Sequence, residues 1–146
     1  MQHLQAEKFF AITPPAAIVD NAAFTTATID TLGFNELLVV VYLGALDIAV
    51  AAMKLQESEA SNMASPTDIT GTVGGTSYTL PIATDDNTFI AFHVKTGGQR
   101  KRYIDLVITG GDGSTGTFMS AFALLGKGTT TPSTAAARGT GQFISV

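Results

Sequence analysis

A glycine-rich segment between two apolar stretches is the feature of this sequence that most restricts its fold. The segment GGDGSTG, residues 110–116, follows the stretch RYIDLVIT, in which apolar and polar residues alternate. The stretch that comes after it, GTFMSAFALLG, is rich in small and apolar residues. Two strand-like stretches joined by a short glycine-rich segment are typical of a β-hairpin. We therefore predict that these two strands pair with each other.

Other stretches have the same strand-like composition, with many Thr, Val and aromatic residues between glycine-rich breaks. We expect extended chain at Ala16–Asp20, and strands with two-residue alternation at Phe24–Leu32 and Phe89–Thr96. The segment Asp47–Ser58 fits either a short helix capped by Asp47 or a strand, and we favour a strand for its second half. Seven or eight short strands with little helix predict an all-β fold, a jelly-roll-like antiparallel β-sandwich with extended terminal arms.

The length of 146 residues fits one domain. We assign residues 1–146 to a single β-sandwich domain and residues 1–13 to an N-terminal arm. Residues 128–141, which are rich in Thr, Ala and Gly, are expected to form a flexible tail segment. The last residues, QFISV, could add a final strand.

A continuous hydrophobic stretch, FNELLVVVYLGAL, covers residues 34–46. It is typical of a strand that is buried on both faces or of a strand at an interface. The longer run Leu37–Met53 is not predicted to cross a membrane. Gly44 interrupts it, Asp47 lies inside it, and a membrane-spanning helix needs about 20 apolar residues.

Charged residues make up only 14% of the chain, and the net charge is −4. Soluble domains contain about 25% charged residues, and a free surface needs charge to stay dispersed. We infer that oligomerisation or attachment to a larger assembly covers much of the surface. There is no cysteine, so the chain offers no disulfide, thiolate nucleophile or cysteine zinc site.

The sequence gives little evidence for catalytic or metal-binding residues. His3 and His93 are far apart in the chain, and the turns at 84–87 and 110–116 lack the regular acidic spacing of a calcium loop. Glu57 and Glu59 fall on one face of a strand, which is more often a solvated edge than a pair of catalytic carboxylates. No phosphate-binding, dinucleotide-binding or nucleophile motif is present. We expect no enzyme activity, no metal and no cofactor.

A basic cluster interrupts the otherwise acidic chain. Lys95, Arg100, Lys101 and Arg102 are four of its eight Lys and Arg residues. A nucleic-acid site would need a broader basic surface, so we expect no nucleic-acid partner. On physical grounds, an acidic patch on another protein and a solvated loop that protects a strand end fit the cluster equally well.

Two blocks of the sequence resemble the small head proteins of tailed bacteriophages. One is GGQRKRYIDLVITGGDGSTGTFMSAFALLGKG, in which Arg102-Tyr103 precedes an apolar strand, a glycine-rich turn and a strand of small residues. The other is FNELLVVVYLGALDIAVAAMKLQESEASNM, with its Leu-Gly turn and LQES before a polar loop. Together the two blocks cover somewhat under half of the chain.

The resemblance implies a decoration or cement protein on the outer surface of a phage capsid. Such a protein would bind the major capsid protein as a homodimer or homotrimer and brace neighbouring capsomers. For the polar contacts we favour Lys95, Arg100, Lys101, Arg102 and Tyr103. We consider Phe9 and Phe10 as an anchor on the N-terminal arm, although they would equally well complete a local core. The alternative function is a carbohydrate- or receptor-binding β-sandwich module of a virion, which the absence of Trp disfavours.

Overall fold

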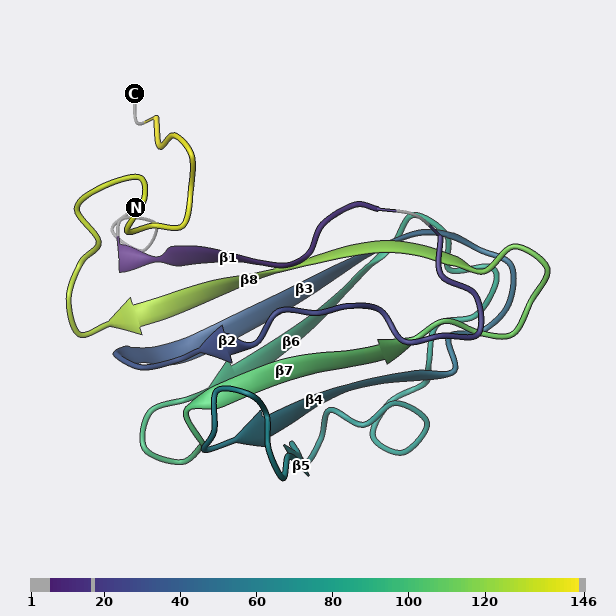
Figure 1. Ribbon diagram of the computed structural model, residues 1–146, viewed down its shortest axis with the longest axis horizontal. Coiled ribbons are helices and arrows are strands. Elements are labelled where there is room, and N and C mark those ends of the chain that lie inside the picture. The colour runs from purple at the N-terminus through teal and green to yellow at the C-terminus, as the bar shows by residue number, and fades with distance from the viewer. Residues whose placement is uncertain (1–5, 17, 145–146) are drawn as a thin grey trace.

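The computed structural model describes residues 6–16 and 18–144 of the chain and has two four-stranded sheets packed face to face (Figure 1). All neighbouring strands within each sheet are antiparallel. Sheet A has the order β1-β8-β3-β6, and sheet B has the order β2-β7-β4-β5. The predicted all-β antiparallel sandwich is therefore confirmed. The strands of sheet A are β1 (Lys8–Thr13), β8 (Thr117–Gly128), β3 (Phe34–Leu46) and β6 (Phe89–Lys95), and those of sheet B are β2 (Ile29–Asp30), β7 (Tyr103–Thr109), β4 (Ala52–Ser58) and β5 (Thr67–Asp68).

The core lies between the two sheets and follows from the alternation of the strands. In β7 the side chains of Ile104, Leu106 and Ile108 are buried, as the sequence pattern predicts. In β3, Leu37, Val39, Val41 and Leu43 are fully buried, and the residues between them are not. The strand β3 is therefore buried on one face only.

The predicted hairpin between β7 and β8 is wrong. Strand β7 pairs with β2 and β4 in sheet B, whereas β8 pairs with β1 and β3 in sheet A. The segment 110–116 crosses from one sheet to the other. Long-range contacts hold this crossing in place, because Val19 and Thr117 exchange two backbone hydrogen bonds of 3.0 and 2.8 Å and Asp47 accepts a hydrogen bond from the Thr115 N–H.

The chain between β1 and β3 is less regular than its alternation predicts. Of the stretch Phe24–Leu32, only Ile29–Asp30 forms a strand. In the stretch Ala16–Asp20, Val19 makes a single bridge to Thr117. The strand favoured for the second half of Asp47–Ser58 is confirmed as β4, and residues 142–144 are not in a strand.

The two terminal segments lie side by side at one end of the sandwich (Figure 1). Of the expected N-terminal arm, Lys8–Thr13 is a strand paired with β8, and residues 1–5, which include His3, lie outside the described residues. In the expected tail, Arg138 is buried and its carbonyl accepts a 2.7 Å hydrogen bond from the Phe9 N–H. This part of the tail packs against β1.

Candidate functional site: the outer face of sheet A

The side of sheet A that faces away from the core is unusually apolar. The registers place Phe122 beside Val40 and Ala11, and Tyr42 beside Phe89. Because directly opposite residues in antiparallel strands share a face, these side chains form one surface. We call it the apolar face and define it by Phe9, Ala11, Leu38, Val40, Tyr42, Phe89, Ala91, Phe118, Phe122 and Leu124.

Four aromatic side chains of the apolar face are open to solvent. Phe89 is 66% exposed, and Tyr42, Phe118 and Phe122 are 37–39% exposed. Tyr42 and Phe89 stack with ring centroids 4.5 Å apart, so each ring restricts the movement of the other. A contiguous exposed apolar patch on a small protein marks an interaction surface.

Charged residues border one end of the apolar face. Glu36 lies on β3 between Lys95 of β6 and Gly126 of β8. The Nζ atom of Lys127 lies 2.5 Å from Glu36 Oε1, and Nε2 of His93 lies 3.9 Å from Glu36 Oε2. Donation by Lys127 lowers the pKa of Glu36. The charge of Glu36 is therefore paired within the chain, and the charged side chains lie at the border of the apolar face rather than inside it.

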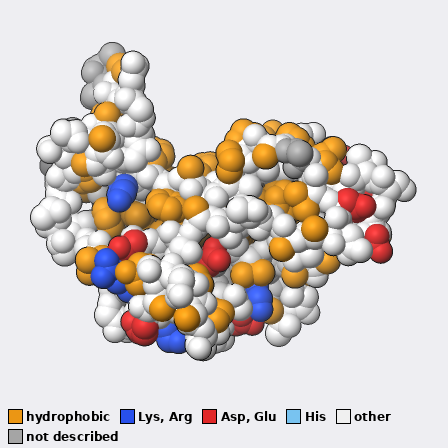
Figure 2. All heavy atoms as spheres, viewed as in Figure 1, with side chains coloured by type: hydrophobic (Ala, Val, Ile, Leu, Met, Phe, Trp, Pro, Cys, Tyr) orange, Lys and Arg blue, Asp and Glu red, His pale blue; other side chains and the backbone are white. Residues whose placement is uncertain are grey.

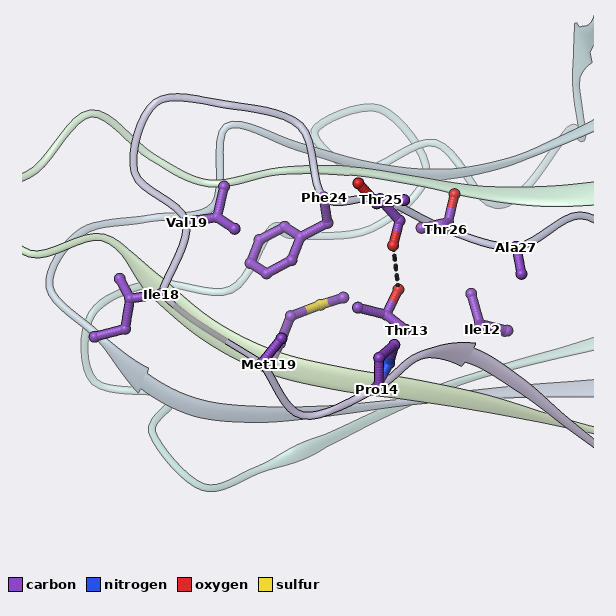
Figure 3. Close-up of a pocket in the computed structure, with 11 residues that line it drawn as sticks. Ile12, Thr13, Pro14, Ile18, Val19, Phe24, Thr25, Thr26, Ala27 and Met119 are labelled. Atoms are coloured by element: carbon purple, nitrogen blue, oxygen red, sulfur yellow. Dashed lines mark hydrogen bonds between the residues drawn. The ribbon is translucent and has the colours of Figure 1, made fainter.

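Two apolar hollows lie near the other end of sheet A, one beside the apolar face and one on the core side of the sheet. One, of about 490 Å³, lies among Tyr42, Phe118 and Ile18. The second, of about 400 Å³, lies between β8 and the segment that follows β1 (Figure 3). In this hollow Phe24 and Met119 point toward each other, and the Thr13 hydroxyl donates a 3.0 Å hydrogen bond to the Thr25 carbonyl. Among the described residues, no carboxylate, histidine or lysine lines either hollow, so both suit apolar contact rather than proton transfer.

The basic cluster predicted from the sequence is largely paired with acidic residues of the same chain. Arg102 donates two hydrogen bonds to Asp30, at 2.8 and 2.7 Å, and its guanidinium lies 5.0 Å from the ring centre of Tyr103. Nη1 of Arg100 lies 3.6 Å from Glu57 Oε1. Sequence reasoning missed these pairs because both acids are distant in the chain.

The remaining residues of the cluster have separate surroundings. Lys101 donates from Nζ to the Thr67 hydroxyl at 3.1 Å and from its backbone N–H to Glu57 at 3.2 Å. Lys95 lies on the border of the apolar face and is exposed. The structure therefore brings Arg100, Lys101 and Arg102 to one end of sheet B and places Lys95 on sheet A. Figure 2 shows the same mixture, with basic and acidic side chains adjacent along the lower side of the molecule.

The two phenylalanines considered as an anchor point in opposite directions. Phe9 lies opposite Leu124 and belongs to the apolar face, whereas Phe10 lies opposite Ala123 and packs against the core. Both are half-buried. Only Phe9 therefore faces outward, as an anchor on a partner would require. Phe10 instead helps to complete the core.

Carboxylates that accept hydrogen bonds make the stability of the fold sensitive to acid. The pKa of Asp30 is lowered by Arg102, and the pKa of Asp47 is lowered by the N–H groups of Thr115 and Gly116. A folded pKa below the unfolded value adds stability that is complete above the unfolded pKa and is lost as the pH falls through the folded pKa.

We therefore expect the free energy of unfolding to fall below about pH 4. Urea titrations between neutral pH and pH 3 measure this loss. In Asp47→Asn the loss should be smaller, whereas Asp112→Asn, which removes an exposed loop carboxylate, should behave as the wild type. Equal acid sensitivity of Asp47→Asn and the wild type would show that the Asp47 contacts do not contribute.

Metal-binding and membrane-spanning features are both missing from the part of the chain that the structure describes. Residues 6–16 and 18–144 bring together no group of three His, Asp or Glu side chains that could hold a metal ion. Within the same residues there is no helix with the length and hydrophobicity that a membrane crossing requires. No family model, curated protein or solved structure matches the chain.

Proposed function

We propose that the protein is a structural subunit that decorates the outside of a tailed-bacteriophage capsid and cements neighbouring capsomers. In this proposal the apolar face of sheet A binds the major capsid protein. The observation that carries the proposal is the exposure of four aromatic side chains on one sheet surface whose charged residues lie at its border. The two blocks of sequence that resemble small phage head proteins supply the identity of the partner.

The physical properties of the apolar face suit attachment to a repeated lattice. A standard protein interface buries about 800 Å² on each partner. One side of sheet A is no larger than this, because its four strands span about 19 Å in width and contain 6 to 13 residues each. Repeated attachment to many identical sites raises the effective affinity of modest contacts. Low overall charge supports close packing of subunits against a shell.

The basic cluster has a secondary part in this proposal. Glutamates at Arg100 and Lys101 would reverse two charges of the cluster, but they would also repel Glu57 and disturb the local structure. Arg100→Gln with Lys101→Gln is the sharper variant. We expect shell binding to weaken about threefold at low salt, because charges outside the apolar contact act mainly by steering the encounter over a distance, and the difference should disappear at high salt.

Co-sedimentation of the purified protein with shells that lack it measures this effect. Lys54→Gln is the matched control, since Lys54 is also paired on sheet B, with Asp68 at 2.9 Å, but lies outside the cluster. Wild-type binding by a folded Arg100→Gln, Lys101→Gln protein at low salt would remove the cluster from the interface.

A further inference from the structure

Strand β6 forms the longest open strand edge among the described residues. The outermost strands of the two sheets are β1, β6, β2 and β5. The strands β2 and β5 have two residues each. In β1 the pairing shifts between Ala11 and Thr13, and the Phe9 N–H bonds to Arg138. The seven residues of β6 instead pair with β3 without a shift and include no proline.

The hydrogen bonds at the two ends of β6 show which residues face outward. The Leu43 N–H donates to Thr88 O, and the Thr96 N–H donates to Asn35 O, both at 2.9 Å. Because bonded and non-bonded pairs alternate in antiparallel ladders, residues 88, 90, 92, 94 and 96 bond to β3. The N–H and C=O groups of Phe89, Ala91, His93 and Lys95 therefore point away from the sheet, where no described strand pairs with them.

This open edge is accessible and lacks most of the usual protection. Phe89, Ala91, His93 and Lys95 all have exposed side chains. A hollow of about 420 Å³ lies beside the second half of β6, between His93 and Lys95 and the turn at 69–72. Long regular edges without a bulge or proline offer a template for another strand.

We propose that β6 pairs with β6 of a second copy of this chain, antiparallel and about a two-fold axis. The register that uses the whole edge places Phe89 opposite the second copy's Lys95 and Ala91 opposite the second copy's His93. The aliphatic stem and ammonium group of the lysine then lie on the phenylalanine ring, which is a favourable contact. A register centred on His93 would instead set two histidines directly opposite each other.

The two-fold axis fixes the shape of the dimer. An axis perpendicular to the sheet joins the two four-stranded sheets A into one continuous sheet. Both apolar faces then lie on the same side, which doubles the surface offered to one partner. The dimer itself does not depend on the proposed function, since it can be measured in solution without any capsid.

Ala91→Pro tests the pairing, because proline removes an N–H that points outward and leaves the bonds to β3 in place. Sedimentation equilibrium should show a dimer for the wild type, and a dissociation constant at least about tenfold higher for Ala91→Pro. Ala91→Ser keeps the N–H at the same position and should dimerise normally. If Ala91→Pro does not fold, Ala91→Lys, which adds a charge opposite the second copy's His93, should weaken the dimer instead. A monomeric wild type, or Ala91→Pro and Ala91→Lys proteins that fold and dimerise as the wild type does, would overturn the proposal.

The absence of cysteine allows the register to be tested directly. A mixture of Ala91→Cys and His93→Cys chains should form a disulfide-linked heterodimer under mild oxidation, since directly opposite residues have Cα atoms about 5.5 Å apart. A mixture of Phe89→Cys and His93→Cys chains should cross-link much less. The reverse preference would contradict the register.

Discussion

Phe122→Lys is expected to reduce binding to capsid shells by about a hundredfold or more. Phe122 lies in the apolar face beside Val40 and Ala11, and its side chain is 38% exposed. In the free protein a lysine at this position can extend into water. In the bound state its charge would be buried without a partner, and an aromatic contact would be lost, which together cost at least about 3 kcal/mol. Co-sedimentation with shells over a range of protein concentrations measures the change.

The control for this experiment is Ile82→Lys. Ile82 is also an exposed hydrophobic residue, at 49%, but it belongs to the loop before β6 rather than to a strand of sheet A. The Ile82→Lys protein should bind shells as the wild type does. Circular dichroism and thermal unfolding establish that both variants fold. Normal binding by folded Phe122→Lys would exclude the centre of the apolar face from the interface.

Gly111→Ala should lower the free energy of unfolding by about 2–3 kcal/mol. Gly111 is buried in the crossing from β7 to β8. A Cβ atom there would overlap the carbonyl oxygen of Ala49 and the side chain of Ile48. The backbone between β3 and β4 would have to move, because a carbonyl oxygen cannot rotate away as a flexible side chain does. Urea unfolding of the purified variant measures the loss.

Gly141→Ala is the matched control for this substitution. A Cβ atom added at Gly141 would meet nothing within 4 Å, and the backbone there is not in the left-handed region. The same change should therefore leave the free energy of unfolding nearly unchanged. Equal stability of Gly111→Ala and Gly141→Ala would mean that the crossing does not pass against the Ile48–Ala49 backbone. The interpretation of residues 110–116 as a hairpin would then regain support.

The sequence predicts the strands of this fold better than their partners. Alternation in Ile104, Leu106 and Ile108 correctly gives both the strand β7 and its buried face. A glycine-rich connection looks the same whether the next strand pairs with the last one or crosses to the opposite sheet. The choice is made by contacts with Val19 and Asp47, which are distant in the chain and leave no local signal.

The candidate site was only partly predictable for the same reason. The hydrophobic run at 34–46 admits burial on both faces or a role at an interface, and the structure shows Tyr42 exposed beside Phe89. The apolar face becomes visible only when the registers place β1, β8, β3 and β6 side by side. The basic cluster was visible in the sequence, but its acidic partners Asp30 and Glu57 come from other strands.

The central claim is that this protein covers a capsid lattice, and its copy number on particles tests that claim most directly. Quantitative mass spectrometry of particles purified through a density gradient gives the ratio of this protein to the major capsid protein. We predict that the number of copies of this protein per copy of the major capsid protein is close to a ratio of two small integers. A subunit that occupies equivalent sites throughout the lattice would give such a ratio. A few copies per particle, or none, would contradict the cement function.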